Sequence, residues 1–159
     1  MYRLLFTSIA QLDDHADGAG GAISHIVERS RDNNRKRELT GALLYANGTF
    51  IQALEGPASH IETVFEAISA DRRHKQIKVI ELELTKARLF ENWNMAFVGT
   101  SSEPTRLSVN RDLMHIAVTV DARPAEAIRQ MRVLINEMSR RTDSGGQTGS
   151  SQRSAAMGA

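Results

Sequence analysis

The fold is decided by residues 39–56, which read LTGALLYANGTFIQALEG. Two apolar runs flank the dipeptide Asn47-Gly48, and both of its residues accept positive φ, so the stretch is typical of a β-hairpin. Side chains alternate along a strand, so Phe50, Gln52 and Leu54 share one face. A buried amide without hydrogen-bond partners costs about 1–3 kcal/mol. Either the protein core or a polar planar ligand must therefore supply partners for Gln52.

The segments around the hairpin predict an α+β protein with a ferredoxin-like βαββαββ sheet. We expect strands at 2–8, 77–84 and 93–99, a helix at 22–33, and a second helix that begins at Ser59. Glu62 follows Ser59 by three positions and completes a capping box. This order is the split βαβ plan, in which both helices cover one face of the sheet.

The other face of the sheet is too apolar to stay in water. We expect two C-terminal helices, at 106–117 and 124–141, or a second subunit, to cover it. The later helix carries an apolar stripe at helical spacing, formed by Ile128, Met131, Ile135 and Met138. We therefore divide the chain into a domain at 1–100, a helical cap at 101–141 and a Ser/Gly-rich tail at 142–159, which we expect to be disordered.

Composition excludes several classes of protein. The chain has 159 residues, 41% of them hydrophobic, and no cysteine, which rules out disulfides, thiolate metal sites and cysteine nucleophiles. A net charge of +1 favours neither nucleic acid nor membrane. The five histidines show no metal-ligand spacing, and no metal site is expected. Without a signal pattern or a membrane-spanning run, we expect a soluble, cytoplasmic protein.

Several polar residues have both a structural and a functional interpretation. Asn33 and Asn34 can cap the first helix, since asparagine tolerates left-handed φ. Alternatively, Asn34 presents a donor and an acceptor to the edge of a ligand. Two other groups also have two interpretations. Arg72, Arg73 and Lys75 form either a solvated helix end or a phosphate contact. Trp93 and Met95 belong either to the core or to a functional site.

Taken together, these residues resemble the BLUF domain, the flavin-based blue-light sensor family. The resemblance is carried by NRKRELTGAL at 34–43 and GTFIQALEG at 48–56, followed in the right order by DRRH at 71–74 and WNM at 93–95. It runs from about residue 2 to residue 99. The C-terminal helices resemble the cap of short, single-domain members.

The resemblance implies a non-covalent flavin, FAD or FMN, held between the first two helices over the sheet. Asn34 matches the residue that hydrogen-bonds the polar pyrimidine edge, and Gln52 matches the switch glutamine beside N5 and O4. Further matches are Ile26, Ser30 and Asn33 along the ring, and Asp71 and His74 near the ring and ribityl chain. The resemblance also implies a sensor and not an enzyme, whose partner is a second copy or a separate signalling protein, with no nucleic acid and no membrane.

Phe6 departs from the family pattern, which has a tyrosine at this position. That tyrosine hydrogen-bonds the glutamine and gives an electron and a proton to the excited flavin. A phenyl ring has no O–H and can do neither, and neither Tyr2 nor Tyr45 is placed to replace it. We expect a blocked or altered photocycle, in a natural member or in a Tyr-to-Phe variant. The nearly isosteric change should preserve fold and flavin binding.

Trp93 and Met95 are the remaining photoactive candidates. On one strand, they point the same way, so sliding the strand by two residues would exchange one for the other beside Gln52. With Phe6 inert, Trp93 becomes the best remaining electron donor.

Two rival functions remain open from the sequence. One is a ferredoxin-like module that binds RNA or another ligand without sensing light, although RNA-binding sheets need exposed aromatic and basic residues. The other is a dimerisation module that has lost its flavin.

Overall fold

The computed structural model describes residues 1–12, 18–99 and 107–145. The strands and helices follow one another in the order that the sequence predicts, and two C-terminal helices come last. In chain order the elements are β1 (Tyr2–Ala10), α1 (Gly18–Lys36), β2 (Thr40–Ala46), β3 (Thr49–Gly56), α2 (Ala58–Ser69), β4 (His74–Leu84), β5 (Ala96–Gly99), α3 (Leu107–Thr119) and α4 (Pro124–Gly145).

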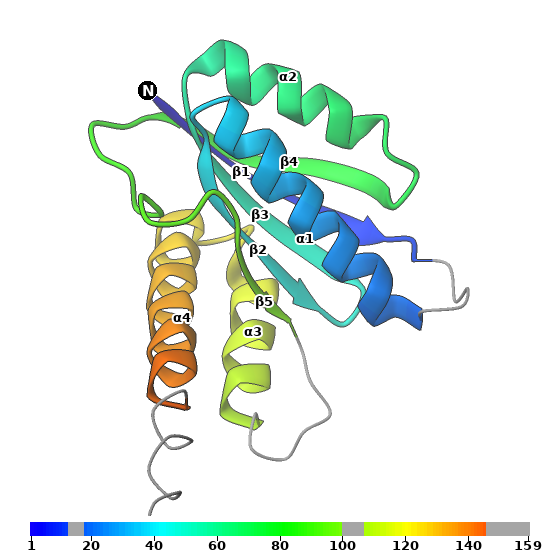
Figure 1. Cartoon of the computed structure of the whole chain (residues 1–159), viewed down its shortest axis with the longest axis vertical. Coiled ribbons are helices and arrows are strands. Elements are labelled where there is room, and N and C mark those ends of the chain that lie inside the picture. Colours follow the sequence, from blue (N-terminus) through cyan, green and yellow to red (C-terminus); the bar gives the residue numbers. More distant parts are fainter. Residues whose placement is uncertain (13–17, 100–106, 146–159) are drawn as a thin grey trace, which may run out of the picture.

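The strands form one mixed sheet in the order β4-β1-β3-β2-β5. β1 runs antiparallel to both β3 and β4, whereas β2 and β5 are parallel. Helices α1 and α2 lie over one face, and α3 and α4 lie against the other (Figure 1). The predicted ferredoxin-like α+β fold is confirmed.

The hairpin forms as predicted, because its turn residues take the required backbone angles. Asn47 has φ 44° and Gly48 has φ 79°, both in the left-handed region that a two-residue hairpin turn needs. The resulting register places Leu43 opposite Gln52. Each strand then alternates between the two faces of the sheet.

The sheet separates two hydrophobic cores. On the α3/α4 side, Leu5, Leu44 and Ile51 are fully buried, as is expected once the C-terminal helices cover them. The predicted α4 stripe packs there, with Ile128, Met131 and Ile135 buried and Met138 against them. In the described part of the chain, helices therefore cover the central strands on both faces, whereas RNA-binding versions of this fold leave one face open.

α1 is longer than predicted, running from Gly18 to Lys36, so the asparagine pair lies inside the helix. The left-handed residue that ends the helix is Glu38, with φ 54°. The Leu39 N–H donates to the Asn34 carbonyl at 2.9 Å, which is the long bond of a Schellman motif. The cap interpretation of Asn34 is therefore wrong, and its side chain instead donates a hydrogen bond to the Asn94 carbonyl.

α2 begins at Ala58, without the predicted capping box. Pro57 stands at the N-cap with φ −60° and ψ 139°, and no side chain caps the helix. Ser59 already lies inside the helix, where its carbonyl accepts a hydrogen bond from Thr63 Oγ1 at 2.9 Å. The fixed φ of Pro57 starts the helix earlier than a serine cap would.

β5 begins at Ala96 and not at Trp93. The preceding segment is held by turn hydrogen bonds, with the Trp93 N–H donating to the Phe90 carbonyl at 3.0 Å. The Trp93 side chain packs on the α3/α4 side of the sheet, whereas Met95 is buried on the α1/α2 side. The prediction that these two share a strand face is wrong, because two-residue periodicity does not hold outside a strand.

At its C-terminal end, α4 continues to Gly145, into the segment assigned to the tail from its composition. Residues 146–159, the rest of that segment, lie outside the described part.

A buried ionic network fastens the end of β3 to the segment that leads to β5. The fully buried Glu55 carboxylate accepts a hydrogen bond from Arg3 Nε at 2.7 Å. It also accepts the Thr40 hydroxyl at 3.2 Å and the backbone N–H groups of Leu89 and Phe90 at 2.8 and 3.0 Å. A buried charge is tolerated when it is paired and fully hydrogen-bonded, as Glu55 is.

Candidate functional site: a cleft between α1 and α2

A cleft opens between α1 and α2 above the sheet, with about 710 Å³ of space, part of it open to solvent. Its wall comprises Ile26, Arg29, Ser30, Asn33 and Asn34 from α1, Arg37 directly after α1, Thr63, Val64, Ala67 and Ile68 from α2, Gln52 from β3, and Asp71, Arg73 and His74 from the turn before β4 and its start.

Gln52 forms the floor of this cleft. The sheet register places it directly opposite Phe6 on one side and Leu43 on the other. Gln52 is only 3% exposed to solvent. Because both cross-strand neighbours are hydrocarbon, the Gln52 amide makes no hydrogen bond to any protein atom in the described part of the chain.

Asn34 lies in the last turns of α1, and its side chain is completely buried. Its Nδ2 donates to the Asn94 carbonyl at 2.7 Å. Since only the NH₂ group can donate to a carbonyl, the remaining atom is the oxygen. Within the described residues, this Oδ1 has no hydrogen-bond partner. Asn34 therefore offers the cleft a desolvated acceptor that requires a donor.

The end of the cleft near β4 is charged. The Arg73 Nε donates to Asp71 Oδ1 at 2.9 Å, and the Arg73 backbone N–H donates to the same oxygen at 2.9 Å. The hydrogen bond from the Arg73 side chain lowers the pKa of Asp71 to about 2. Asp71 is therefore ionised at neutral pH and serves only as an acceptor.

His74 closes the same end of the cleft. A hydrogen bond of 2.9 Å joins its Nδ1 to Ser8 Oγ, and its ring lies 4.9 Å from the ring of Phe50. Burial lowers the pKa of His74 below its usual value, so the imidazole is neutral at pH 7. A neutral imidazole can both donate and accept.

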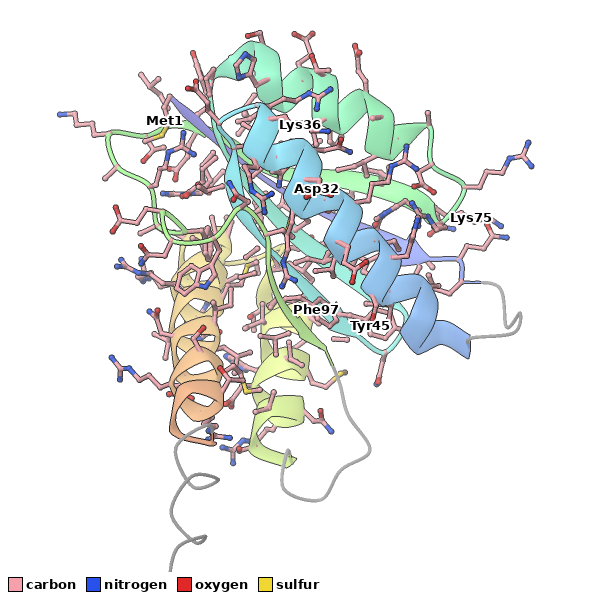
Figure 2. The ribbon with its side chains drawn as sticks, viewed as in Figure 1. Met1, Asp32, Lys36, Tyr45, Lys75 and Phe97 are labelled. Atoms are coloured by element: carbon pink, nitrogen blue, oxygen red, sulfur yellow. The ribbon has the colours of Figure 1, made fainter. Side chains whose placement is uncertain are left out.

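Phe6 is fully buried beside Gln52, with its ring edge-on to Phe65 at 5.2 Å between centroids. Among the described residues that line the cleft there is no tyrosine, and so no phenol. Tyr2 lies at the far end of β1, opposite Gly56. Tyr45 lies near the hairpin turn, on the strand next to β5 and its Phe97 (Figure 2).

The structure brings most of the predicted site residues together. Ile26, Ser30, Asn33, Asn34, Gln52, Asp71 and His74 all line the cleft. Met95 is buried in the same core as Phe6, whereas Trp93 lies on the opposite side of the sheet.

The sequence reasoning missed Arg29, Arg37, Thr63 and Ala67 as wall residues. The signal was available, because Arg29, and Arg37 just beyond the end of α1, continue the helical spacing of Ile26, Ser30 and Asn33.

Among the described residues, no cluster of three or more His, Asp or Glu side chains could hold a metal ion. What the cleft provides is apolar surface from Ile26, Val64 and Ile68, together with the Gln52 amide and an Asn34 oxygen that has no hydrogen-bond partner among the described residues. This combination suits one planar molecule with polar edges. Fold and site together define a small-ligand-binding α+β domain.

Comparison with known proteins assigns the family. A family model described as BLUF, sensors of blue-light using FAD, matches residues 1–96. The structure superimposes on BlrB, a BLUF protein in its dark state, with a TM-score of 0.69 and 30% identity, over 83% of this chain and 95% of that one. The chain therefore belongs to the BLUF family of flavin-based blue-light sensors.

Two relatives carry the same domain inside larger proteins. The photoactivated adenylate cyclase subunit beta of Euglena gracilis is 28% identical over 46% of this chain and 9% of its own length. The blue light- and temperature-regulated antirepressor BluF of Escherichia coli K12 is 32% identical over 43% of this chain and 17% of its own length. These matches span only a small part of each relative. In the described part of this chain, no helix is long and apolar enough to cross a membrane.

Proposed function

We propose that this chain senses blue light with a non-covalent flavin, FAD or FMN, in the α1/α2 cleft, and that Phe6 blocks or alters its light reaction. One observation carries the proposal: Asn34 Oδ1 is buried without a hydrogen-bond partner among the described residues, and it lines the same cleft as the Gln52 side chain. Buried polar groups of this kind are rare unless a ligand satisfies them.

Each wall has a role toward the flavin. Asn34 Oδ1 would accept from the imide N–H of the ring, while its Nδ2 keeps its bond to the Asn94 carbonyl. Ile26, with the apolar side chains of α2, would cover the ring faces. Ser30 and Asn33 would supply polar atoms to the ring, and Asp71 and His74 would contact the ribityl chain. When bound, the flavin supplies light absorption and a one-electron acceptor.

Gln52 is the residue that reports the excited state. Its side chain carries two donors on nitrogen and an acceptor on oxygen, so a rotation of the amide exchanges what it offers to the flavin edge. Met95, buried in the adjoining core, is positioned to sense that exchange. In this chain, Phe6 offers no O–H with which to hold or trigger the rotation.

We further propose that the signal acts on a separate partner or on a second copy, not on a substrate. The adenylate cyclase activity in the name of one relative belongs to that protein, and the match with this chain covers only 9% of its length. The cleft here contains groups that bind and report, and the described residues include no metal cluster.

The first prediction concerns flavin binding. Purified protein should be yellow, and denaturation should release the flavin, whose identity chromatography against FAD and FMN standards would establish. Asn34→Ala removes the buried acceptor and should weaken binding by about tenfold or more, since such a hydrogen bond is worth about 1–3 kcal/mol.

The matched control is Asn92→Ala, which changes an exposed asparagine away from the cleft. It should leave the dissociation constant unchanged in a fluorescence titration. A colourless protein that takes up neither FAD nor FMN would disprove the proposed function.

A second prediction concerns Trp93 as the electron donor that remains when Phe6 has replaced the tyrosine. The indole lies on the far side of the sheet from the cleft, so prolonged illumination should give only slow, unproductive flavin reduction. Trp93→Phe should suppress this reduction and lengthen the flavin excited-state lifetime. Identical fluorescence decays in the two proteins would instead assign Trp93 to packing against α4.

A further inference from the structure

On the outward face of α4, charged residues lie at equal distances on either side of Val133, and the two members of each pair have opposite signs. Glu126, Arg129, Val133, Glu137 and Arg140 follow one another at spacings of three and four, which places them on one side of a helix. This side is opposite the buried stripe that packs on the sheet. At its midpoint, Val133 is 57% exposed.

Most of these charges lack partners within the described chain. Glu126 is used, since it accepts from Arg123 at 3.3 Å and from Gln130 Nε2 at 3.1 Å. Arg129, Glu137 and Arg140 form no ion pair with any described residue. Arg129 and Glu137 cannot pair along the helix either, because eight residues separate their Cα atoms by about 12 Å.

Gln130 adds a second, independent observation beside this face. Its Oε1 is buried and has no hydrogen-bond partner among the described residues. The atom lies at the groove between α4 and α3, whose wall includes Ile116, Val133 and Leu134. A buried acceptor next to an exposed valine indicates a surface that is completed by another molecule.

We infer that α4 binds the α4 of a second copy of this chain, antiparallel and centred on Val133. In that arrangement, each position faces the one at the same distance on the other side of Val133. Arg129 then faces Glu137 of the second copy, and Glu126 faces its Arg140. A two-fold interface repeats each pair, so both copies contribute four complementary contacts from one sequence.

The same register also brings groups together at its centre. Val133 of one copy packs against Val133 of the other and is removed from water. A parallel arrangement would place like charges side by side, so the charge pattern selects the antiparallel one.

The interface is expected to be weak. Stable complexes bury about 1,200–2,000 Å² in total, and one helix face with a single central valine provides less. Exposed ion pairs are also screened by salt. The dimer should therefore depend on protein concentration and dissociate as salt is raised. It does not depend on flavin binding, because α4 and the cleft lie on opposite faces of the sheet (Figure 1).

Sedimentation velocity over a range of protein concentrations tests the interface. Val133→Glu places two like charges at the centre and should raise the dimer dissociation constant by at least about tenfold. Val118→Glu is the matched control, because Val118 is a still more exposed valine, at 73%, on the neighbouring helix α3. It should leave the association unchanged.

A charge exchange distinguishes this register from any other contact. Glu137→Arg alone and Arg129→Glu alone should each prevent self-association, because both make the facing pair alike in sign. Mixed together, the two variants should associate, since each facing pair is again opposite. Circular dichroism and flavin absorption would confirm that each variant is folded and loaded.

A protein that stays monomeric at its highest soluble concentration would overturn the inference. So would a dimer that is insensitive to Val133→Glu, or two singly exchanged variants that fail to associate with each other. None of these outcomes would affect the assignment of the flavin cleft.

Discussion

Phe6→Tyr should give the protein a reversible red shift of its flavin band under blue light, a shift that is absent or greatly reduced in the original chain. The reason is the sheet register, which places Phe6 directly opposite Gln52. Directly opposed residues on antiparallel strands have Cβ atoms about 4.5–5.5 Å apart. A phenol there can hydrogen-bond the amide and supply an electron and a proton.

Difference spectra before and after illumination, followed by dark recovery, measure this effect. Phe50→Tyr is the matched control, because Phe50 is also fully buried and shares the strand face of Gln52, but is not opposite it. It should bind flavin and show no restored shift. A full-size, reversible shift in the original chain would show that a tyrosine at this position is dispensable. A flavin-loaded Phe6→Tyr protein without any shift would show that the block lies elsewhere.

Glu55→Gln should destabilise the fold by about 3–5 kcal/mol, the range observed when one partner of a buried ion pair is removed. The carboxylate is fully buried and accepts four hydrogen bonds, one of them from Arg3. A glutamine has a single acceptor oxygen, and its NH₂ group would face N–H donors. Arg3, only 8% exposed in its side chain, would lose its buried counter-charge.

Urea unfolding, followed by circular dichroism, measures this loss. Glu83→Gln is the control, because Glu83 also pairs with Arg3 but its side chain is 42% exposed. Exposed pairs contribute about 0–1 kcal/mol, so its effect should be small. Equal unfolding midpoints for the two variants would mean that Glu55 is not the anchor of the segment before β5.

The fold could be predicted from the sequence because its signals are local. Asn47-Gly48 fixes a hairpin turn through two residues that accept positive φ. Once the turn is fixed, strand alternation determines that Gln52 shares a face with Phe50. The apolar stripe of α4 likewise predicted what that helix would cover, because an amphipathic helix must bury one side.

Where sequence reasoning failed, a neighbouring residue or a contact from another segment had overridden the local preference. Ser59 is a good cap in isolation, yet Pro57 starts the helix before it. Trp93 and Met95 look like alternate residues of a strand. However, the Trp93 carbonyl accepts the Gly41 N–H at 3.0 Å, and the regular strand begins only at Ala96. Their side chains consequently occupy opposite cores.

The sequence by itself determined the class of fold, the position of Gln52 on its strand and the absence of a phenol at residue 6. Only the tertiary structure decided that Asn34 is a desolvated acceptor, because its burial depends on the Asn94 carbonyl, sixty residues away along the chain. It also decided that Gln52 has no protein partner, since this depends on what β1 and β2 place on either side of it. Periodicity reports which face a residue takes, whereas hydrogen-bond satisfaction depends on every segment that meets there.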